Sequence, residues 1–368
     1  MTRKLKITSI LFSILAVAVA VLALMVSHDS PCTPAAPPQA GVATMKAVMY
    51  RCYGPPEVLK LEEVEKPAPA ADELLVKVRA AGVNPLDFHY MRGMPYIMRM
   101  GAGFGAPKDP HMGVDFAGSV EAVGKDVKNF HVGDDVFGGR SGAFGEYIVV
   151  KESRNVVTKP ANVSYDEAAA VPIAAITALQ ALRDKGKLQA GQLVLINGAS
   201  GGVGTFAVQI AKSLGANVTG VCSTRNVELV RSLGADLVVD YKNEDFVKRP
   251  ERYDVIVDTV GNRDLSEYRS VLNPKGRYVM VGGPNDGKWV GPMSGALKAS
   301  LYSPFVSQTF SMMLAELNPG DLALLRDLMA AGKLRSVIDR RYALGEVPTA
   351  VSYVEEGHAR GKVIITME

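Results

Sequence analysis

The pattern of hydrophobic and polar positions over residues 193–226 follows a strand, a turn, a helix and a second strand. Leu193 to Ile196 is a continuous apolar run with β-branched members, which is typical of a buried strand. The helical spacing of apolar residues over Thr205 to Leu214 predicts a helix that ends at Gly215, and Asn217 to Cys222 predicts the second strand. These elements form one right-handed βαβ unit with parallel strands.

The pattern differs on the two sides of this unit. Residues 45–150 carry short alternating strands separated by turn residues, which predicts a β-rich domain. After Cys222 the strand and helix rhythm continues, which predicts a doubly wound parallel sheet. The expected later elements are helices over 226–233, 264–272, 321–331 and 346–355, strands over 236–240, 253–258, 277–281, 305–310 and 362–366, and a flexible segment over 289–302.

The first 44 residues have a different composition. Ile7 to Val26 carries no charge and, at about 1.5 Å a residue, is long enough to cross about 30 Å of hydrocarbon. We expect residues 1–26 to be an uncleaved transmembrane helix that anchors the protein in a membrane, with a signal peptide removed after translocation as the alternative. Residues 27–44 are rich in Pro and Ala and predict an extended linker. Three basic residues precede the helix and place the folded part on the far side, which conflicts with a cytoplasmic cofactor, so the side stays open.

The turn inside the βαβ unit, Ala199-Ser200-Gly201-Gly202-Val203-Gly204, is G-x-G-x-x-G with alanine in first place. The second glycine lets the backbone approach a pyrophosphate and the third lets helix and strand pack closely. The start of the helix offers unpaired N–H groups to the phosphates. The turn therefore predicts a dinucleotide site, with cofactor contacts from Ser200, Gly201, Gly202, Val203 and Gly204.

Two other interpretations of this turn exist. It is also G-x-S-x-G, the nucleophile elbow of a serine hydrolase, for which Asp258 or Asp339 and His358 would complete the triad. It could also be no more than a tight turn. The dinucleotide interpretation is favoured because the pattern continues into Val203-Gly204 and further strand and helix units follow.

The end of the second strand indicates which dinucleotide binds. NAD-binding folds place Asp or Glu about 20 residues beyond the glycine turn. This chain has Ser223-Thr224-Arg225-Asn226 there, and hydroxyl and guanidinium groups suit a ribose 2′-phosphate. NADPH is therefore the expected cofactor, held by Ser223 and Arg225. The alternative is that Arg225 is a solvated residue at a helix start.

Composition excludes several classes of function. The chain has 368 residues, 48% of them hydrophobic, and a net charge of +3, of which Arg3, Lys4 and Lys6 less Asp29 contribute +2. The nearly neutral remainder argues against nucleic-acid binding. The three cysteines are widely spaced without a C-x-x-C pair, so we expect neither a disulfide framework nor a zinc site.

Taken together, these features make the chain similar to the zinc-free, quinone-oxidoreductase-like branch of the medium-chain dehydrogenase/reductase superfamily. The stretches that carry the resemblance are Val83 to Asp87, Gly113 to Gly118 with Val123-Gly124 and Gly133-Asp134, Asn197 to Gly204, and Leu233 to Asp236 with Asp240-Tyr241. The resemblance implies a GroES-like catalytic domain over 45–170, a Rossmann domain over 171–334 and a C-terminal segment over 335–368 that returns to the first. The nicotinamide would lie between the two domains.

The resemblance also implies roles for single residues. Asn84 and Thr177 would lie near the nicotinamide, and Asp87 would hold the Asn84 loop. Tyr90, like Tyr96, would be a proton donor or an apolar wall. Tyr241 would lie near the adenosine phosphate or serve packing alone.

Zinc-dependent relatives carry Gly-His-Glu where this chain has Gly113-Val114-Asp115, so we expect no metal. The expected function is an NADPH-dependent, zinc-independent oxidoreductase that reduces a quinone or an α,β-unsaturated carbonyl compound. The alternatives are a zinc-free alcohol dehydrogenase and a membrane-tethered dinucleotide-binding protein without turnover. The substrate would be a small molecule, and the interpretation is compatible with a homodimer.

Overall fold

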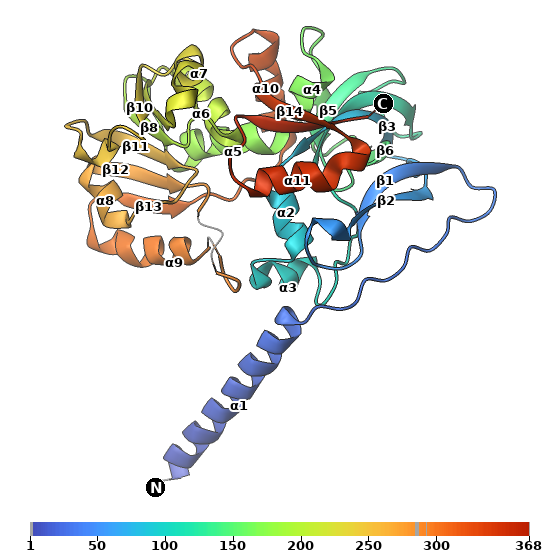
Figure 1. Ribbon diagram of the computed structural model, residues 1–368, viewed down its shortest axis with the longest axis horizontal. Helices are drawn as coiled ribbons and strands as arrows, with labels where there is room; N and C mark the ends of the chain where they lie inside the picture. Colours follow the sequence, from blue (N-terminus) through green and yellow to red (C-terminus); the bar gives the residue numbers. More distant parts are fainter. Residues whose placement is uncertain (1–2, 284–286, 292, 368) are drawn as a thin grey trace.

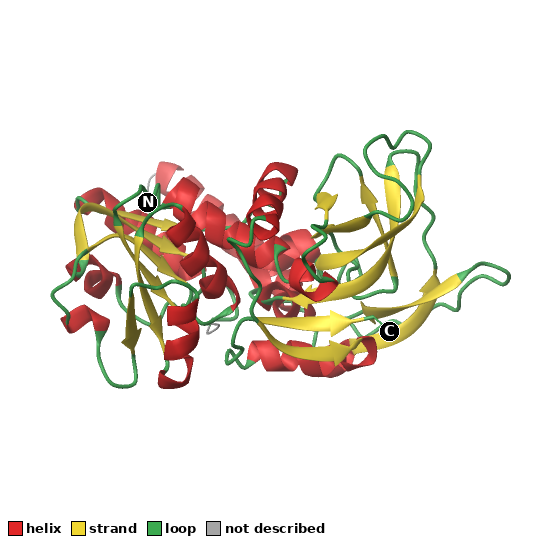
Figure 2. Ribbon diagram, turned by 90° about the horizontal axis from the view of Figure 1, so that it is seen from above, coloured by secondary structure: helices red, strands yellow, loops and turns green. Residues whose placement is uncertain are grey.

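The computed structural model describes residues 3–283, 287–291 and 293–367. Two large sheets divide the folded chain, one parallel and one mostly antiparallel, and Figures 1 and 2 show them on opposite sides of the molecule. Short helical turns connect the main elements: η1 Pro56–Val58, η2 Tyr96–Met98, η3 Ala181–Lys185, η4 Thr224–Asn226, η5 Phe246–Lys248, η6 Ser303–Phe305 and η7 Leu344–Glu346.

The parallel sheet is a Rossmann sheet. Its strand order is β10-β9-β8-β11-β12-β13, which is the doubly wound order with a reversal between β8 and β11. The strands are β8 Leu193–Asn197, β9 Asn217–Cys222, β10 Leu237–Asp240, β11 Tyr253–Asp258, β12 Leu272–Met280 and β13 Thr309–Met312. The helices are α5 Pro172–Gln180, α6 Gly202–Ser213, α7 Val227–Ser232, α8 Leu265–Ser270, α9 Met293–Tyr302 and α10 Pro319–Ala330.

Alternation along the parallel strands separates two cores. Val194 and Ile196 of β8 face the core shared with α5, α6 and α10, whereas Leu195 faces the core shared with α8 and α9. Because both faces of the sheet are covered, its central strands β8 and β11 are largely apolar. The predicted doubly wound sheet is therefore confirmed.

The β-rich part contains the other large sheet and a separate hairpin of β1 and β2. Its strands are β1 Thr44–Tyr50, β2 Leu59–Glu65, β3 Glu73–Val83, β4 Asp115–Val123, β5 Asp135–Gly139, β6 Tyr147–Lys151, β7 Val156–Thr158, β14 Ile338–Ala343 and β15 Lys362–Thr366, and its helices are α2 Pro85–Arg92, α3 Arg99–Ala102, α4 Tyr165–Ala169 and α11 Val347–Glu355. β15 pairs antiparallel with β3, with Val363 opposite Val83. The end of the chain thus completes the first sheet.

One later segment differs from the sequence-based expectation. Residues 289–302 were expected to be flexible, but the structure has the helix α9 over most of this range. Ala299 of α9 is buried in the core that contains Phe310, so packing against the sheet stabilises the helix.

The predicted transmembrane anchor is wrong. The N-terminal helix α1 spans Arg3–Ser27 and projects from the body of the protein (Figure 1). Within the described part of the chain, no helix is long and apolar enough to cross a membrane. The expectation of a membrane-anchored protein is withdrawn with it.

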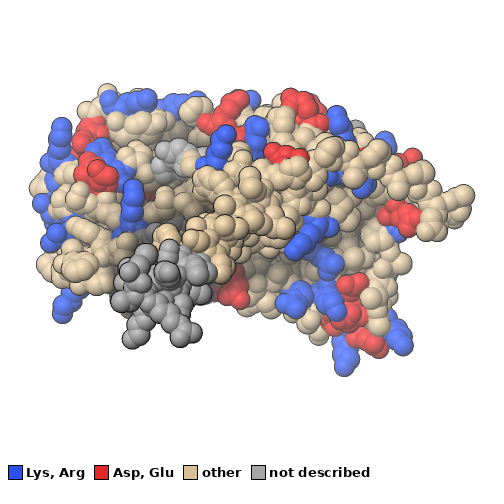
Figure 3. Space-filling model, turned by 90° about the horizontal axis from the view of Figure 1, so that it is seen from below, with Lys and Arg blue, Asp and Glu red and all other residues tan. Residues whose placement is uncertain are grey.

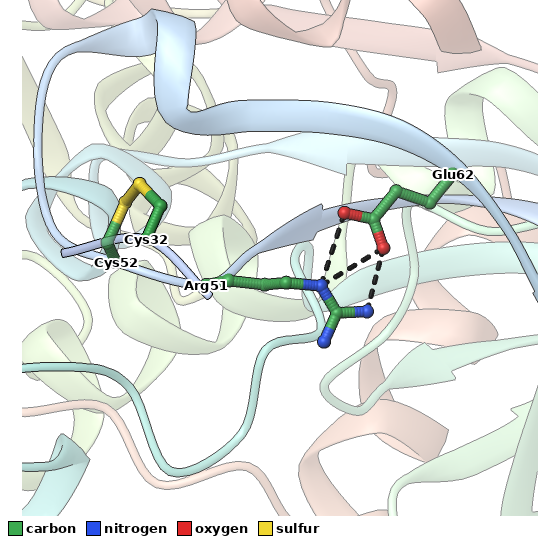
Figure 4. The surroundings of a disulfide bond; sticks show 4 residues. All are labelled: Cys32, Arg51, Cys52 and Glu62. Atoms are coloured by element: carbon green, nitrogen blue, oxygen red, sulfur yellow. Dashed lines mark hydrogen bonds and ion pairs between the residues drawn. A yellow bond between two sulfur atoms is a disulfide. The ribbon is translucent and has the colours of Figure 1, made fainter. Parts of the chain in front are cut away.

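The expectation that the cysteines form no disulfide is also wrong. Cys32 of the linker is bonded to Cys52 at the end of β1 (Figure 4), with their Cα atoms 4.7 Å apart. The two cysteines are 20 residues apart in the sequence, and this separation does not by itself predict a disulfide. The bond forms because the linker folds back and brings Cys32 close to Cys52. Cys222 is free and buried.

Candidate active site

The glycine turn lies between the end of β8 and the start of α6, at the point where the strand order reverses. Gly198 has a φ of +84°, and a Cβ there would lie 2.2 Å from the Thr259 Oγ1 atom. A Cβ on Gly204 would lie 2.1 Å from the carbonyl oxygen of Gly198. A Cβ on Gly201, in contrast, would meet only that carbonyl oxygen, at 3.5 Å. The turn is therefore closed toward the strand and open at Gly201, which is the side where a pyrophosphate would fit.

Polar side chains gather beside this turn at the end of β9. Asn226 donates from Nδ2 to the hydroxyl of Ser200 at 3.0 Å and to that of Ser223 at 3.2 Å. Its Oδ1 atom accepts a bond of 2.7 Å from Nε of Arg360. Arg225 is exposed. These contacts join the glycine turn, the end of β9 and the C-terminal segment.

Arg225 lies beside the same C-terminal segment, because its guanidinium donates to the carbonyl of His358 at 3.2 Å. The guanidinium of Arg360 is linked to Ser223 through Asn226, and Arg225 follows Ser223 by two residues. Of these two arginines, only Arg225 was predicted from the sequence. The sequence signal for Arg360 is the basic run His358 to Lys362. Tyr241 is 55% exposed, and its N–H donates to the carbonyl of Cys222, the residue before Ser223.

A second polar cluster is buried beside the turn. The Nδ2 atom of Asn84 donates to Asp115 Oδ2 at 2.9 Å and to the Gly82 carbonyl at 3.3 Å. Lys362 donates from Nζ to Asn84 Oδ1 at 2.5 Å and to the Val83 carbonyl at 3.0 Å, and its Nζ lies 3.5 Å from Asp115 Oδ2. Because both amide hydrogens and the amide oxygen of Asn84 have partners in the protein, its side chain is held in one orientation.

Lys362 connects this cluster with the glycine turn. A Cβ on Gly202 would lie 3.3 Å from Cδ of Lys362, so the lysine stem packs on the turn while its ammonium reaches Asn84. The cluster also binds α5, because the N–H of Ile173 donates to Asp115 Oδ1 at 3.0 Å. Sequence reasoning missed Lys362. Its signal is one lysine in an otherwise apolar strand.

Burial controls the protonation of these groups. Asp87 is 1% exposed and accepts the N–H of Asn84 at 2.7 Å, which closes the capping box at the start of α2. Burial raises the pKa of Asp87 to about 7. Burial also raises the pKa of Asp115 and lowers that of Lys362, and the attraction between these two charges opposes both changes.

Asp87 should therefore make stability depend on pH. Its pKa rises from 3.8 to about 7 on folding, so the folded chain binds more protons between these values and the free energy of unfolding falls as pH rises through them. Asp87→Asn keeps an oxygen acceptor for the Asn84 N–H but does not titrate, so this fall should be smaller in the variant. Urea unfolding at several pH values between about 4 and 8 measures the difference. Equal pH slopes in the two proteins would contradict it.

The remaining predicted residues are placed as follows. Thr177 is 7% exposed, and its hydroxyl donates to the Ile173 carbonyl at 2.6 Å within α5. Val203 lies in the first turn of α6 and packs against the main core. Tyr90 packs against the core of the β-rich part. The structure brings Asn84 and Asp87 together, but it does not join Tyr90 to them by a hydrogen bond.

A cavity of about 340 Å³ opens at the same end of the β-rich sheet. Strand register aligns Gly82 with Asp115 and Asp115 with Gly139, so the cavity residues Val114 and Gly139 lie at the end that also carries Asn84. Leu317, from the segment between β13 and α10, forms another wall. The space thus lies at the contact between the two parts of the chain and is large enough for a small molecule.

Two alternative chemistries, a metal site and a hydrolase triad, can be compared with the described residues. No group of three or more His, Cys, Asp or Glu side chains able to hold a metal occurs among them. The hydrolase triad is not assembled, because Ser200 is bonded to Asn226, while Asp258 is buried and binds Tyr278 at 2.7 Å. Basic and acidic side chains are interspersed on the face in Figure 3.

Known proteins resemble the chain over most of its length. Residues 70–161 match the alcohol dehydrogenase GroES-like domain, and residues 233–365 match a family described as zinc-binding dehydrogenase. The 2-methylene-furan-3-one reductase of Solanum lycopersicum is 35% identical over 87% of this chain and 79% of its own. The chloroplastic quinone oxidoreductase QR1 of Triphysaria versicolor is 34% identical over 87% and 98%. The solved quinone oxidoreductase of Coxiella burnetii is 30% identical, covers 89% of this chain and 100% of its own, and superposes with a TM-score of 0.78.

Proposed function

The chain belongs to the medium-chain dehydrogenase/reductase superfamily, and we propose that it reduces a quinone or an α,β-unsaturated carbonyl compound with NADPH and without zinc. It is an NAD(P)H-dependent oxidoreductase of small molecules, in agreement with relatives that are named quinone oxidoreductases and reductases. The observation that carries the proposal is the position of Lys362, which contacts both the open glycine turn and the buried cluster around Asn84.

The preference for NADPH is supported by the cluster beside Ser223. A 2′-phosphate carries nearly two negative charges, and the guanidinium groups of Arg225 and Arg360 are suitable partners for it. The Asn226 amide fixes Ser200, Ser223 and Arg360 relative to one another, so this set is organised before a ligand arrives. The Arg225 alternative, a purely solvated side chain, predicts no such preference.

The chain's own residues position the reactants. A bound nicotinamide dinucleotide would supply the hydride. The N–H groups at the start of α6 face the open side of the turn, and the ion pair of Lys362 with Asp115 fixes the loop that begins at Asn84. Val114 and Leu317 give the adjacent cavity an apolar side, and Arg140, Ser141, Arg154 and Asn155 give it a polar side, a combination that suits a small acceptor with an apolar skeleton and a carbonyl oxygen.

The relatives that are named quinone oxidoreductases and reductases favour a conjugated acceptor over an alcohol. We expect purified protein to oxidise NADPH with a quinone or an enone and to be slower with saturated aldehydes of similar size. Measuring kcat/KM for such a matched panel, with alcohols and NADP⁺ in the reverse direction, tests this. A higher kcat/KM for alcohols than for every conjugated acceptor would favour the zinc-free alcohol dehydrogenase alternative.

Arg225 should determine part of the cofactor preference. Arg225→Ala should weaken NADPH binding by about 1.5 to 3 kcal/mol, roughly 10- to 150-fold, because it removes a charge-assisted bond to the 2′-phosphate. NADH binding should change little. Ser223→Asp should reverse the preference, because a carboxylate repels the phosphate. Titration of both cofactors measures these changes, and equal losses for NADH and NADPH would refute the assignment.

A further inference from the structure

Arg99 is a buried arginine outside the site described above, with an exposed fraction of 1%. Its Nε atom donates to the Gly93 carbonyl at 2.7 Å, and its Nη1 atom donates to the carbonyls of Val26 at 3.1 Å and His28 at 3.0 Å. The same Nη1 atom lies 2.8 Å from a carboxylate oxygen of Asp29. The N-terminal segment therefore supplies three of the groups that compensate a buried charge.

Aromatic rings enclose the rest of the guanidinium. Its central carbon lies 4.3 Å from the ring centre of Tyr53 and 4.7 Å from that of Tyr96. The Tyr53 hydroxyl donates to the carbonyl of Gly103 at 2.9 Å. A buried charge is costly unless its partners stay in place, so Arg99 ties the N-terminal segment to residues 94–103, which we call the bridging loop.

Two further contacts fasten the N-terminal segment. The N–H of Ser30 donates to the Gly105 carbonyl at 2.9 Å, just beyond the bridging loop. The disulfide between Cys32 and Cys52 fixes the segment to the end of β1 (Figure 4). Residues 26–32 are thus held at both ends and form part of the packed protein.

The bridging loop also reaches the Rossmann part of the chain. The N–H of Tyr96 donates to the Lys288 carbonyl at 2.7 Å, and the N–H of Ile97 donates to the Trp289 carbonyl at 3.1 Å. The rings of Tyr96 and Trp289 meet edge to face with their centres 5.3 Å apart. The loop follows α2, which begins directly after Asn84, so its contacts join the Rossmann part to the chain segment that continues from the proposed site.

We propose that Arg99 is a positioning residue for hydride transfer: it uses residues 26–32 to hold the bridging loop against Lys288 and Trp289. The N-terminal segment is then a working part of the enzyme, because it fixes how the two sheets face each other around the acceptor. The inference rests on the proposed hydride transfer but not on the identity of the acceptor.

Trp289 is the only tryptophan in the sequence and is 49% exposed, so a change in the quenching of its half-covered ring reports this contact. Arg99→Met preserves most of the side-chain volume but removes the bonds to the N-terminal segment, and Trp289 should become more accessible to acrylamide. Asp29→Asn alters an exposed side chain, so we expect it to fold even where Arg99→Met does not and to shift quenching in the same direction by a smaller amount. Arg99→Lys retains the charge without the fork of donors and should recover only part of the contact.

Kinetics distinguish positioning from packing. We expect kcat/KM for the acceptor to fall at least about tenfold in Arg99→Met, since a small displacement of reacting groups is costly, while the Kd for NADPH stays within about twofold. Arg51→Met is the control, because it removes a part-buried ion pair with Glu62 beside the disulfide and contacts neither the bridging loop nor Trp289 (Figure 4). Unchanged quenching in the folded variants would overturn the inference. So would altered quenching with unchanged kcat/KM. The quenching result stands even if no enone or quinone is reduced.

Discussion

We expect Gly201→Val to abolish tight NADPH binding and to leave the protein folded. Gly201 has a φ of −83° and a ψ of 178°, which any residue adopts, and its missing Cβ would meet only one backbone oxygen, at 3.5 Å. A valine side chain there costs little stability, but it fills the space that the pyrophosphate requires. We expect affinity to fall at least about 100-fold, which is about 2.7 kcal/mol.

Calorimetric titration with NADPH and thermal unfolding without it measure the two quantities. Gly204→Val is the matched control in the same turn, because a Cβ there would lie 2.1 Å from the Gly198 carbonyl oxygen and should destabilise the fold itself. Retained affinity in a folded Gly201→Val protein would show that no pyrophosphate lies against this turn.

Lys362→Met should destabilise the protein by about 3 to 5 kcal/mol, because it would leave the carboxylate of Asp115 buried without its cation. The variant also leaves Asn84 Oδ1 without a donor, so the loop that begins there loses its fixed orientation and turnover falls. The cost should shrink when the carboxylate is neutralised as well, as in Lys362→Met with Asp115→Asn.

Urea unfolding of the two single variants and the double variant provides the coupling energy between the pair. We expect the double variant, Lys362→Met with Asp115→Asn, to be more stable than Lys362→Met alone. Additive losses would show that the two residues act independently and that Lys362 is held by packing alone.

The local patterns predicted β8 to β11 because each contains a short apolar run bounded by turn residues. β12 and β13 carry more polar residues, and the strand expected over 305–310 begins in the turn η6 and only overlaps β13. β9 and β11 begin and end at the predicted residues. The helix α2 was not predicted, because its residues Pro85–Arg92 have no clear apolar face, and its start is signalled instead by the capping box of Asn84 and Asp87 with Pro85 between them.

The candidate site could be predicted only where its residues are close in sequence. The glycine turn and Ser223 follow consecutive strands, so spacing identifies them. Arg360 and Lys362 reach Asn226 and Asn84 from the far end of the chain, which only the pairing of β15 with β3 brings near. The disulfide between Cys32 and Cys52 could not be predicted either, because the folded path of the linker, and not a sequence motif, brings the two cysteines together. The predicted anchor is wrong because, among the described residues, no helix is both long and apolar enough to cross a membrane.

The absorbance of NADPH, followed after exhaustive dialysis against a chelator and with zinc content measured on the same sample, tests the central claim most directly. We predict that the reduced cofactor is consumed in the presence of a quinone or an enone at the rate seen before dialysis, with less than about one zinc in ten chains, because catalytic zinc needs three protein ligands. Activity that disappears with the metal and returns on adding zinc would contradict the account.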